Sequence, residues 1–238
     1  AAGGGSAGRA GAANGLAGSD TPLTVLPGGS TNVYCRTLGI PEDVVDATEH
    51  ILRMADDFEP FPVDLGRVDD RHFVFAAGAG LDASVVERVD GHPYRKARFG
   101  AWYYSACAVD IFMRRYLVNP PRVRVVAGDR VQEGVTVVVQ NSDPFTYFRK
   151  RPIRVVEPAG LSMGSLSMGV LKRATAPELL TLIPRLLSGR ARSVMRHRQI
   201  ESLPEVSTAR VEAIDDRLFP VQVDGDYIGE FSEVEFGL

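Results

Sequence analysis

Two short segments carry side chains whose types and spacing suit phosphate chemistry. In the first, Pro27-Gly28-Gly29-Ser30-Thr31-Asn32, a glycine pair follows a short apolar run. Glycines let the backbone approach a phosphate closely, the two hydroxyls add hydrogen-bond donors, and a helix that starts here would present its N–H groups. Because an ordinary turn between a strand and a helix has the same composition, this segment alone leaves both interpretations open.

The second segment is Val223-Asp224-Gly225-Asp226, which places two carboxylates around a glycine at the end of a strand-like run. Two acids this close can hold Mg²⁺, or one of them can act as a general base on a hydroxyl. Asp-Gly is also a common hairpin-turn dipeptide, and a plain turn is the simpler interpretation of this segment taken alone.

Other catalytic patterns give little support to a different chemistry. Gly3-x-Gly5-x-x-Gly8 matches the dinucleotide fingerprint only formally, because no strand precedes it and glycine is abundant there. The sequence contains no Walker-type phosphate loop, no Gly-x-Ser-x-Gly elbow and no HExxH pair of histidines. Cys35 and Cys107 are too widely spaced to indicate a zinc or disulfide framework, so a reducing cytoplasm is the default compartment.

The residues around the glycine pair follow the order strand, loop, helix, helix, which is typical of an α/β nucleotide-binding unit. The apolar run at residues 23–26 predicts a buried strand, and residues 31–38 predict a helix. A second helix is predicted over residues 41–57, because Pro41 suits a first helical position and the apolar residues of this range fall on one face.

After about residue 62 the pattern changes to short strands separated by turns. Strands are predicted over residues 73–77, 123–126, 134–140, 153–157, 210–214 and 219–224. We therefore predict two domains. Residues 1–62 form a partial α/β nucleotide-binding domain, truncated at its N-terminal side, and residues 63–238 form a β-rich, sandwich-like domain with a few helices.

The helices of this second part are predicted over residues 82–89, 94–117 and 176–187. Asp82 suits the N-cap of the first of them. Thr175 and Glu178 form a capping-box pattern at the start of the last, and Gly189 marks its end. Pro184 is expected to kink or shorten that helix.

The composition is that of an ordinary globular protein, with 238 residues, 45% of them apolar, and a net charge of −3. This balance argues against a nucleic-acid partner, and no apolar run reaches the roughly 18–20 residues that cross a bilayer. The glycine- and alanine-rich start is not a signal peptide. Because residues 234–238 end within a strand-like pattern, we interpret the chain as part of a longer protein.

Charge is distributed unevenly along the chain. Residues 42–70 hold ten acidic and two basic residues, whereas residues 172–198 hold seven basic and one acidic. A further basic group comprises Arg149, Lys150, Arg151 and Arg154. Solvated surface is one interpretation, and docking on an anionic membrane is the other. On the second, changing Arg190, Arg192, Arg196 and Arg198 together would weaken vesicle binding and leave thermal stability nearly unchanged.

Taken in order, the segments resemble the diacylglycerol kinase catalytic-domain family of lipid kinases, in particular its bacterial soluble members of actinobacterial type; sphingosine kinases are related. Residues 26–41 are similar to the family's "PxGTxNxxARxLGIP" segment, and residues 75–83 to its "AGxGxDA" segment. Residues 223–226 resemble its "DGE" motif, with Asp226 in place of glutamate. The resemblance implies that ATP binds between the two domains with Mg²⁺.

By this resemblance, Asp224 would accept the proton of the lipid hydroxyl, and Asp226 would assist with Mg²⁺, as a ligand, or with orientation. The residues expected to hold the nucleotide phosphates are Gly28, Gly29, Ser30, Thr31 and Asn32. Gly4 and Gly5 would be the remnant of the family's phosphate loop.

The sequence departs from the family at two places. The phosphate loop "GGDGT" has Ser6 at the position of its aspartate and Gly8 at the position of its threonine. Residues 162–167 lack the carboxylates of an acidic segment that the family associates with a structural Mg²⁺. We therefore predict that the chain binds ATP poorly and is nearly inactive.

The resulting prediction is an ATP-dependent lipid kinase acting on the hydroxyl of diacylglycerol or a similar lipid. It would be cytoplasmic and peripherally associated with an anionic membrane, with no nucleic-acid partner; a homodimer is left open. The alternative is a catalytically degenerate member that binds lipid or membrane without phosphorylating. A third hypothesis, a nicotinamide-dinucleotide kinase, is disfavoured by the basic region and the Asp224 motif.

Overall fold

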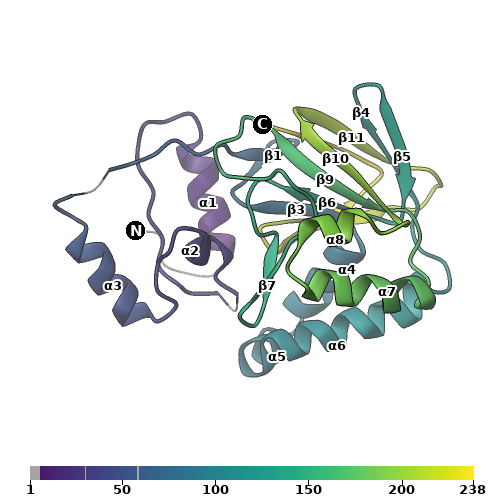
Figure 1. Ribbon diagram of the computed structural model, residues 1–238, viewed down its shortest axis with the longest axis horizontal. Helices are drawn as coiled ribbons and strands as arrows, with labels where there is room; N and C mark the ends of the chain where they lie inside the picture. Colours follow the sequence, from purple (N-terminus) through teal and green to yellow (C-terminus); the bar gives the residue numbers. More distant parts are fainter. Residues whose placement is uncertain (1–5, 30, 58) are drawn as a thin grey trace.

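The computed structural model describes residues 6–29, 31–57 and 59–238. Figure 1 shows a small helical part beside a larger β-rich part. The helices of the small part are α1 (Ser6–Leu16), α2 (Val33–Thr37) and α3 (Val44–Arg53). Within the described ranges, the regular strands all belong to residues after 65.

The β-rich part is built from two six-stranded antiparallel sheets. In spatial order, the first contains β2 (Arg71–Phe73), β1 (Gly66–Val68), β14 (Glu233–Gly237), β11 (Thr208–Ala213), β4 (Val123–Ala127) and β5 (Arg130–Gly134). The second contains β10 (Ile200–Val206), β9 (Leu166–Leu171), β6 (Thr136–Gln140), β3 (Ala76–Gly80), β12 (Phe219–Val223) and β13 (Asp226–Phe231).

The two sheets pack face to face around one core. Val125, Val211 and Phe236 of the first sheet and Val139 and Phe219 of the second belong to a single buried cluster. In β4 buried and half-buried residues alternate, as expected of a strand with one face in the core. The predicted sandwich-like fold is confirmed.

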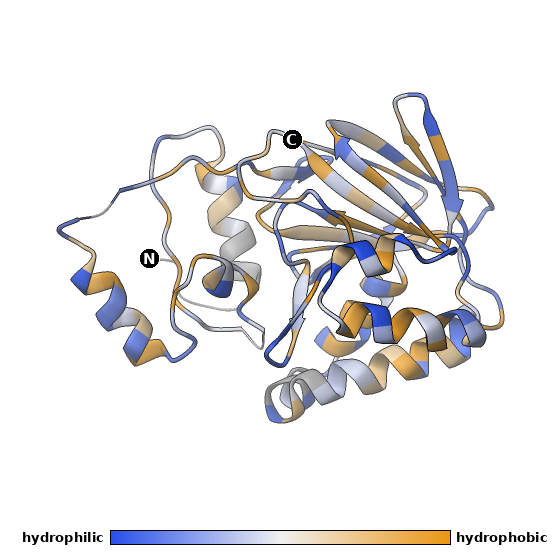
Figure 2. Ribbon diagram, in the orientation of Figure 1, coloured by the Kyte–Doolittle hydropathy of each residue, from blue (hydrophilic) through white to orange (hydrophobic). Residues whose placement is uncertain are grey.

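Helices cover the outer face of the second sheet (Figure 1). They are α4 (Leu81–Asp90), α5 (Pro93–Phe99), α6 (Ala101–Ile111), its π-helical extension (Phe112–Tyr116), α7 (Ala176–Leu187) and α8 (Ala191–Met195). Because the core and the helices cover this sheet on both faces, β3, β9 and β12 are buried along their whole length. Figure 2 shows that hydrophobic residues also run along α6 and α7. No helix in the described part is both long and apolar enough to span a bilayer.

Several predicted elements differ from the structure. The strand expected at residues 23–26 is wrong, because only Val25 forms a β-bridge there. The helix expected over residues 94–117 is broken at Gly100, whose φ of 49° is incompatible with a continuing helix. The strand expected at residues 153–157 is instead the end of a hairpin formed by β7 (Thr146–Phe148) and β8 (Arg151–Ile153).

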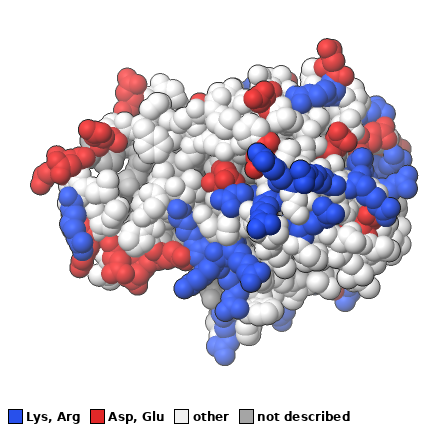
Figure 3. Space-filling model, viewed as in Figure 1, with Lys and Arg blue, Asp and Glu red and all other residues white. Residues whose placement is uncertain are grey.

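The helices of the small part are shorter than predicted. Asp43, rather than Pro41, sets the start of α3, because its carboxylate accepts the N–H of Val45 at 2.8 Å. Ala47 is buried, but Val44 and Val45 on the predicted apolar face are more than half exposed. This side of α3 is therefore not part of the core of the described residues. Figure 3 shows the acidic bias of this part and the basic bias of the β-rich part.

The start of α7 does not form the predicted capping box. Thr175 makes no side-chain cap bond, and the buried carboxylate of Glu178 instead accepts from Arg198 at 2.5 Å and from Gln199 at 3.3 Å. Arg196 is exposed at the end of α8. The arginines around α8 are therefore not equivalent. The expectation that changing Arg190, Arg192, Arg196 and Arg198 together leaves thermal stability nearly unchanged does not hold for Arg198, because Arg198 pairs with the buried Glu178.

We expect Arg198→Ala to lower the thermal midpoint by about 3 °C, because it removes a partner of the buried Glu178 carboxylate. Arg196→Ala, which removes the same charge, should leave the midpoint unchanged. Thermal unfolding followed by circular dichroism checks both variants. Equal midpoints would show that the Glu178 ion pair does not stabilise the fold.

Candidate active site

The Asp224 segment is a hairpin turn whose carboxylate is part of the interior. Val223 pairs with Asp226, and both Asp224 and Gly225 have positive φ, at 49° and 82°. The Asp224 carboxylate is buried and accepts the N–H groups of Val74 at 2.7 Å, Phe75 at 2.9 Å and Ala76 at 3.2 Å. These hydrogen bonds fix the turn to the segment that enters β3.

The glycine segment is closed by its own asparagine. Asn32 has a φ of 46°, and its Oδ1 accepts the N–H of Gly29 at 2.8 Å. That N–H, which we had expected to face a phosphate, is therefore already engaged. Thr31 is half-buried, Gly28 is exposed, and Ser30 lies outside the described residues.

The fold brings the helix that follows the glycine segment close to the Asp224 turn. Tyr34, in the short helix that follows Asn32, packs in one cluster with Val74 and Phe75. Burial raises the pKa of Tyr34, and the nearby charge of Asp224 raises it further. The helix after the glycine segment and the Asp224 turn therefore both pack against residues 74–76, the segment that leads into β3.

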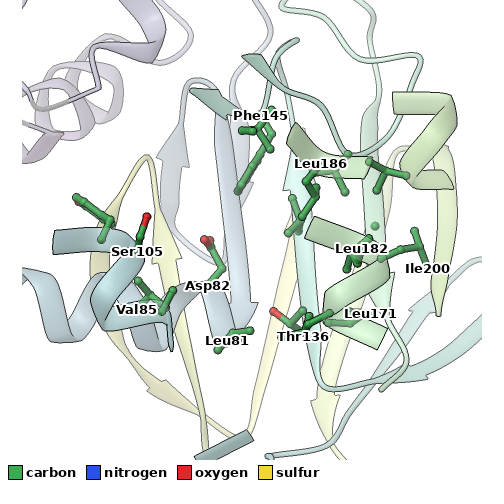
Figure 4. A pocket seen from close by; sticks show the side chains of 18 residues that line it. Leu81, Asp82, Val85, Ser105, Thr136, Phe145, Leu171, Leu182, Leu186 and Ile200 are labelled. Carbon is green, nitrogen blue, oxygen red and sulfur yellow. The ribbon is translucent and has the colours of Figure 1, made fainter. Parts of the chain in front are cut away.

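A cavity of about 360 Å³ lies in the β-rich part, bounded by the second sheet and by α4, α6 and α7 (Figure 4). Its walls are mostly aliphatic, with Val85, Leu171 and Leu182 among them. Polar side chains at the wall include Asp82 and Ser105. The cavity therefore suits an apolar ligand that carries few polar groups.

Asp82 was expected to cap α4, and this prediction is wrong. Gly80 occupies the N-cap position, and the Asp82 carboxyl lies at the cavity wall, where its Oδ2 accepts the side-chain N–H of Gln222 at 2.7 Å. Burial raises the pKa of Asp82 to about 6, and the hydrogen bond from Gln222 opposes that rise. Asp82 is thus an acid that changes charge near neutral pH.

Gln222 connects this acid to the hairpin turn. Its Nε2 donates to Asp82, and its Oε1 accepts the N–H of Gly225 at 2.8 Å. The contact passes over Gly78 of β3, where an added Cβ would lie 2.7 Å from Asp82 Oδ2 and 3.1 Å from Gln222 Nε2. A glycine at position 78 is therefore required for the link between cavity and turn.

The remaining predicted residues are placed less fully. Gly4 and Gly5 lie outside the described residues, and Asp226 is half-buried at the start of β13. The described residues contain no group of three or more His, Cys, Asp or Glu side chains that would hold a metal ion. The role of Asp226 as a single Mg²⁺ ligand stays a prediction.

Sequence reasoning missed Gln222 and the place of Asp82. A sequence signal for Gln222 exists, because it is the single polar residue in the fully buried strand β12. A polar side chain inside such a strand needs a hydrogen-bond partner. For Asp82 the available signal was the resemblance of residues 75–83 to the "AGxGxDA" segment, in which Asp82 stands at the position of the aspartate.

Comparisons with known proteins agree with this architecture. Residues 2–67 match the sequence model of the diacylglycerol kinase catalytic domain, and residues 76–235 match that of the YegS C-terminal NAD kinase beta sandwich-like domain. Diacylglycerol kinases from Bacillus subtilis (strain 168) and Mycobacterium tuberculosis (strain ATCC 25618 / H37Rv) are 24% and 25% identical to the chain over 221 and 223 residues.

These alignments cover 91% and 89% of the chain and 67% and 65% of the two relatives, so the chain spans about two thirds of their length. A crystal structure of a diacylglycerol kinase from Bacillus anthracis str. Sterne has a TM-score of 0.68 at 21% identity and shares the fold, with 98% of this chain and 72% of that chain covered. Because the two matched models account for most of the sequence, the chain belongs to the diacylglycerol kinase catalytic-domain family.

Proposed function

We propose that this chain is an ATP-dependent lipid kinase that phosphorylates the hydroxyl of diacylglycerol or a similar lipid. The observation that carries the proposal is the apolar cavity with the Asp82 carboxyl at its wall. Aliphatic walls suit acyl chains, and one carboxyl suits one hydroxyl. A nicotinamide dinucleotide would need many more polar partners for its riboses and phosphates, so the cavity disfavours that acceptor.

In this proposal the chain positions the acceptor and takes its proton. The Asp82 carboxylate accepts a hydrogen bond from the lipid hydroxyl and orients its oxygen, and Gln222 holds Asp82 in place. The hydroxyl proton then turns from Asp82 to Asp224, which takes it as the hydroxyl oxygen bonds to the γ-phosphorus of MgATP and the bond from that phosphorus to the ADP oxygen breaks. Residues 28–32 and Asp226 are proposed to bind the nucleotide, as the family resemblance implies.

The test is transfer of labelled γ-phosphate from MgATP to dioleoylglycerol in mixed micelles. A labelled phosphatidic acid is the expected product, at a low rate because Ser6 and Gly8 replace the acid and the hydroxyl of the family's phosphate loop. The variant Ser6→Asp, Ala7→Gly, Gly8→Thr restores that loop and should raise the rate. Transfer of the label to NAD, offered as the alternative acceptor, would overturn the proposal. So would the absence of labelled lipid when the restored-loop variant is assayed.

A further inference from the structure

An apolar stripe runs along the outside of α6 and of the π-helical extension that follows it. Trp102, Val109 and Met113 are 66%, 63% and 55% exposed, and Ala106 is also exposed. Their spacing of four, seven and eleven residues from Trp102 places all four on one side of the helix. The opposite side is buried, with Cys107 packed against α4. Within the described residues, none of these four side chains belongs to a buried core cluster.

A second set of exposed apolar side chains lies on α7. Leu180 and Ile183 are 74% and 47% exposed, whereas Leu179, Leu182 and Leu186 on the same helix line the cavity. From α6, Tyr104, Ser105 and Ala108 line the cavity as well. The two helices therefore wall the cavity on one side and present apolar side chains to the solvent on the other.

The β7–β8 hairpin places basic side chains at the end of this surface. The rings of Phe148 and Trp102 meet edge to face, with centroids 6.4 Å apart. The next three residues, Arg149-Lys150-Arg151, are all exposed at the tip, while Ile153 at the other end of the hairpin lines the cavity. Figure 3 shows basic side chains over the hairpin and over α8 bordering a largely uncharged area over α6 and α7.

We propose that the stripe of α6, the exposed residues of α7 and the tip of the β7–β8 hairpin form a face that docks on an anionic lipid bilayer. Apolar side chains next to clustered arginines and lysines complement acyl chains beside anionic headgroups. A second copy of the chain fits this face less well, because a symmetric contact would bring the same three basic side chains together. The proposal rests on the proposed function only for the purpose of docking, which is delivery of lipid to the cavity.

The sequence contains a single tryptophan, and it lies on the proposed face, so its fluorescence reports docking directly. With phosphatidylglycerol-containing vesicles we expect the Trp102 emission to shift to shorter wavelength and to be quenched by brominated acyl chains. Pure phosphatidylcholine vesicles should bind far more weakly, and added salt should weaken binding to the anionic vesicles. This measurement needs no phosphoryl transfer, so its failure is distinct from failure of the kinase assay.

The hairpin variant Arg149→Asn, Lys150→Ser, Arg151→Ser should weaken vesicle binding at low salt on the order of 100-fold. Asparagine is chosen at position 149 because that residue has a φ of 56°, which asparagine tolerates. The control Arg53→Ser, Arg71→Ser, Arg210→Ser removes three exposed positive charges elsewhere and should change binding little. The proposal would be overturned if the two variants weakened vesicle binding equally. It would also be overturned if the Trp102 emission of vesicle-bound protein did not shift, or if the shift depended only on protein concentration.

Discussion

Asp224→Asn is expected to lower the free energy of unfolding by about 1–3 kcal/mol for each backbone N–H group that loses its acceptor. The substitution must leave at least one such N–H group unpaired. The carboxylate accepts N–H groups on both oxygens, at Val74 on one and at Phe75 and Ala76 on the other. An amide offers only one oxygen, and its NH₂ group would meet a second donor. Urea unfolding at neutral pH measures this loss.

Under the proposed function, the same substitution should reduce turnover by about 10²–10⁴-fold, the usual effect of removing a general base. The assay belongs at a temperature at which circular dichroism shows the variant to be folded. Asp226→Asn is the matched control for stability, because Asp226 is half-buried and should change the free energy of unfolding by less than about 0.5 kcal/mol. If Asp224→Asn keeps both stability and turnover, the turn is neither an anchor nor a source of the base.

The second large effect is a gain in stability from Asp82→Asn at pH 8. Burial raises the folded-state pKa of Asp82 from 3.8 to about 6. The contribution of Asp82 to the free energy of unfolding is therefore complete below about pH 4, and it is lost as the pH rises through 6. The difference corresponds to about 3 kcal/mol. Asparagine does not titrate and still offers Oδ1 to Gln222.

We therefore expect the variant to be more stable than the parent by about 3 kcal/mol at pH 8 and nearly equal to it at pH 4. Paired urea unfolding curves from pH 4 to pH 8 measure the difference, in which the other titrating groups cancel. A gain that is independent of pH would show that Asp82 is not an acid with a raised pKa. Under the proposed function the stabilised variant should also lose turnover, because the acceptor hydroxyl loses its charged partner.

The strands that the sequence predicted are those whose environment is uniform along their length. Residues 123–127 alternate between buried and half-buried because only one face is in the core. Residues 137–139 and, apart from Gln222, residues 219–223 are apolar because both faces of the sheet are covered. β9 was missed although it is buried along its whole length, because Ser167 and Gly169 interrupt its apolar run. Two other missed strands lack such a pattern. β5 is an edge strand with polar, mostly exposed residues, and β13 is half-buried at almost every position.

The candidate site was predicted only as far as local composition allows. Asp224 was found because two acids flank a glycine, but its three donors lie about 150 positions earlier in the chain and meet it only through tertiary packing. Asp82 was misplaced for a related reason. Its residue type favours a helix cap, and its hydrogen bond to Gln222 overrides that local preference.

Gln222 also determines how movement at the hairpin turn reaches the cavity. An amide does not titrate, and it has one donating end and one accepting end. Reversing it would set its NH₂ against the N–H of Gly225 and its oxygen against the Asp82 carboxylate, so only one orientation satisfies both neighbours. A ligand that displaces the turn must therefore carry the amide and the cavity acid with it, and a lipid that pulls on Asp82 must in turn pull on the backbone of Gly225.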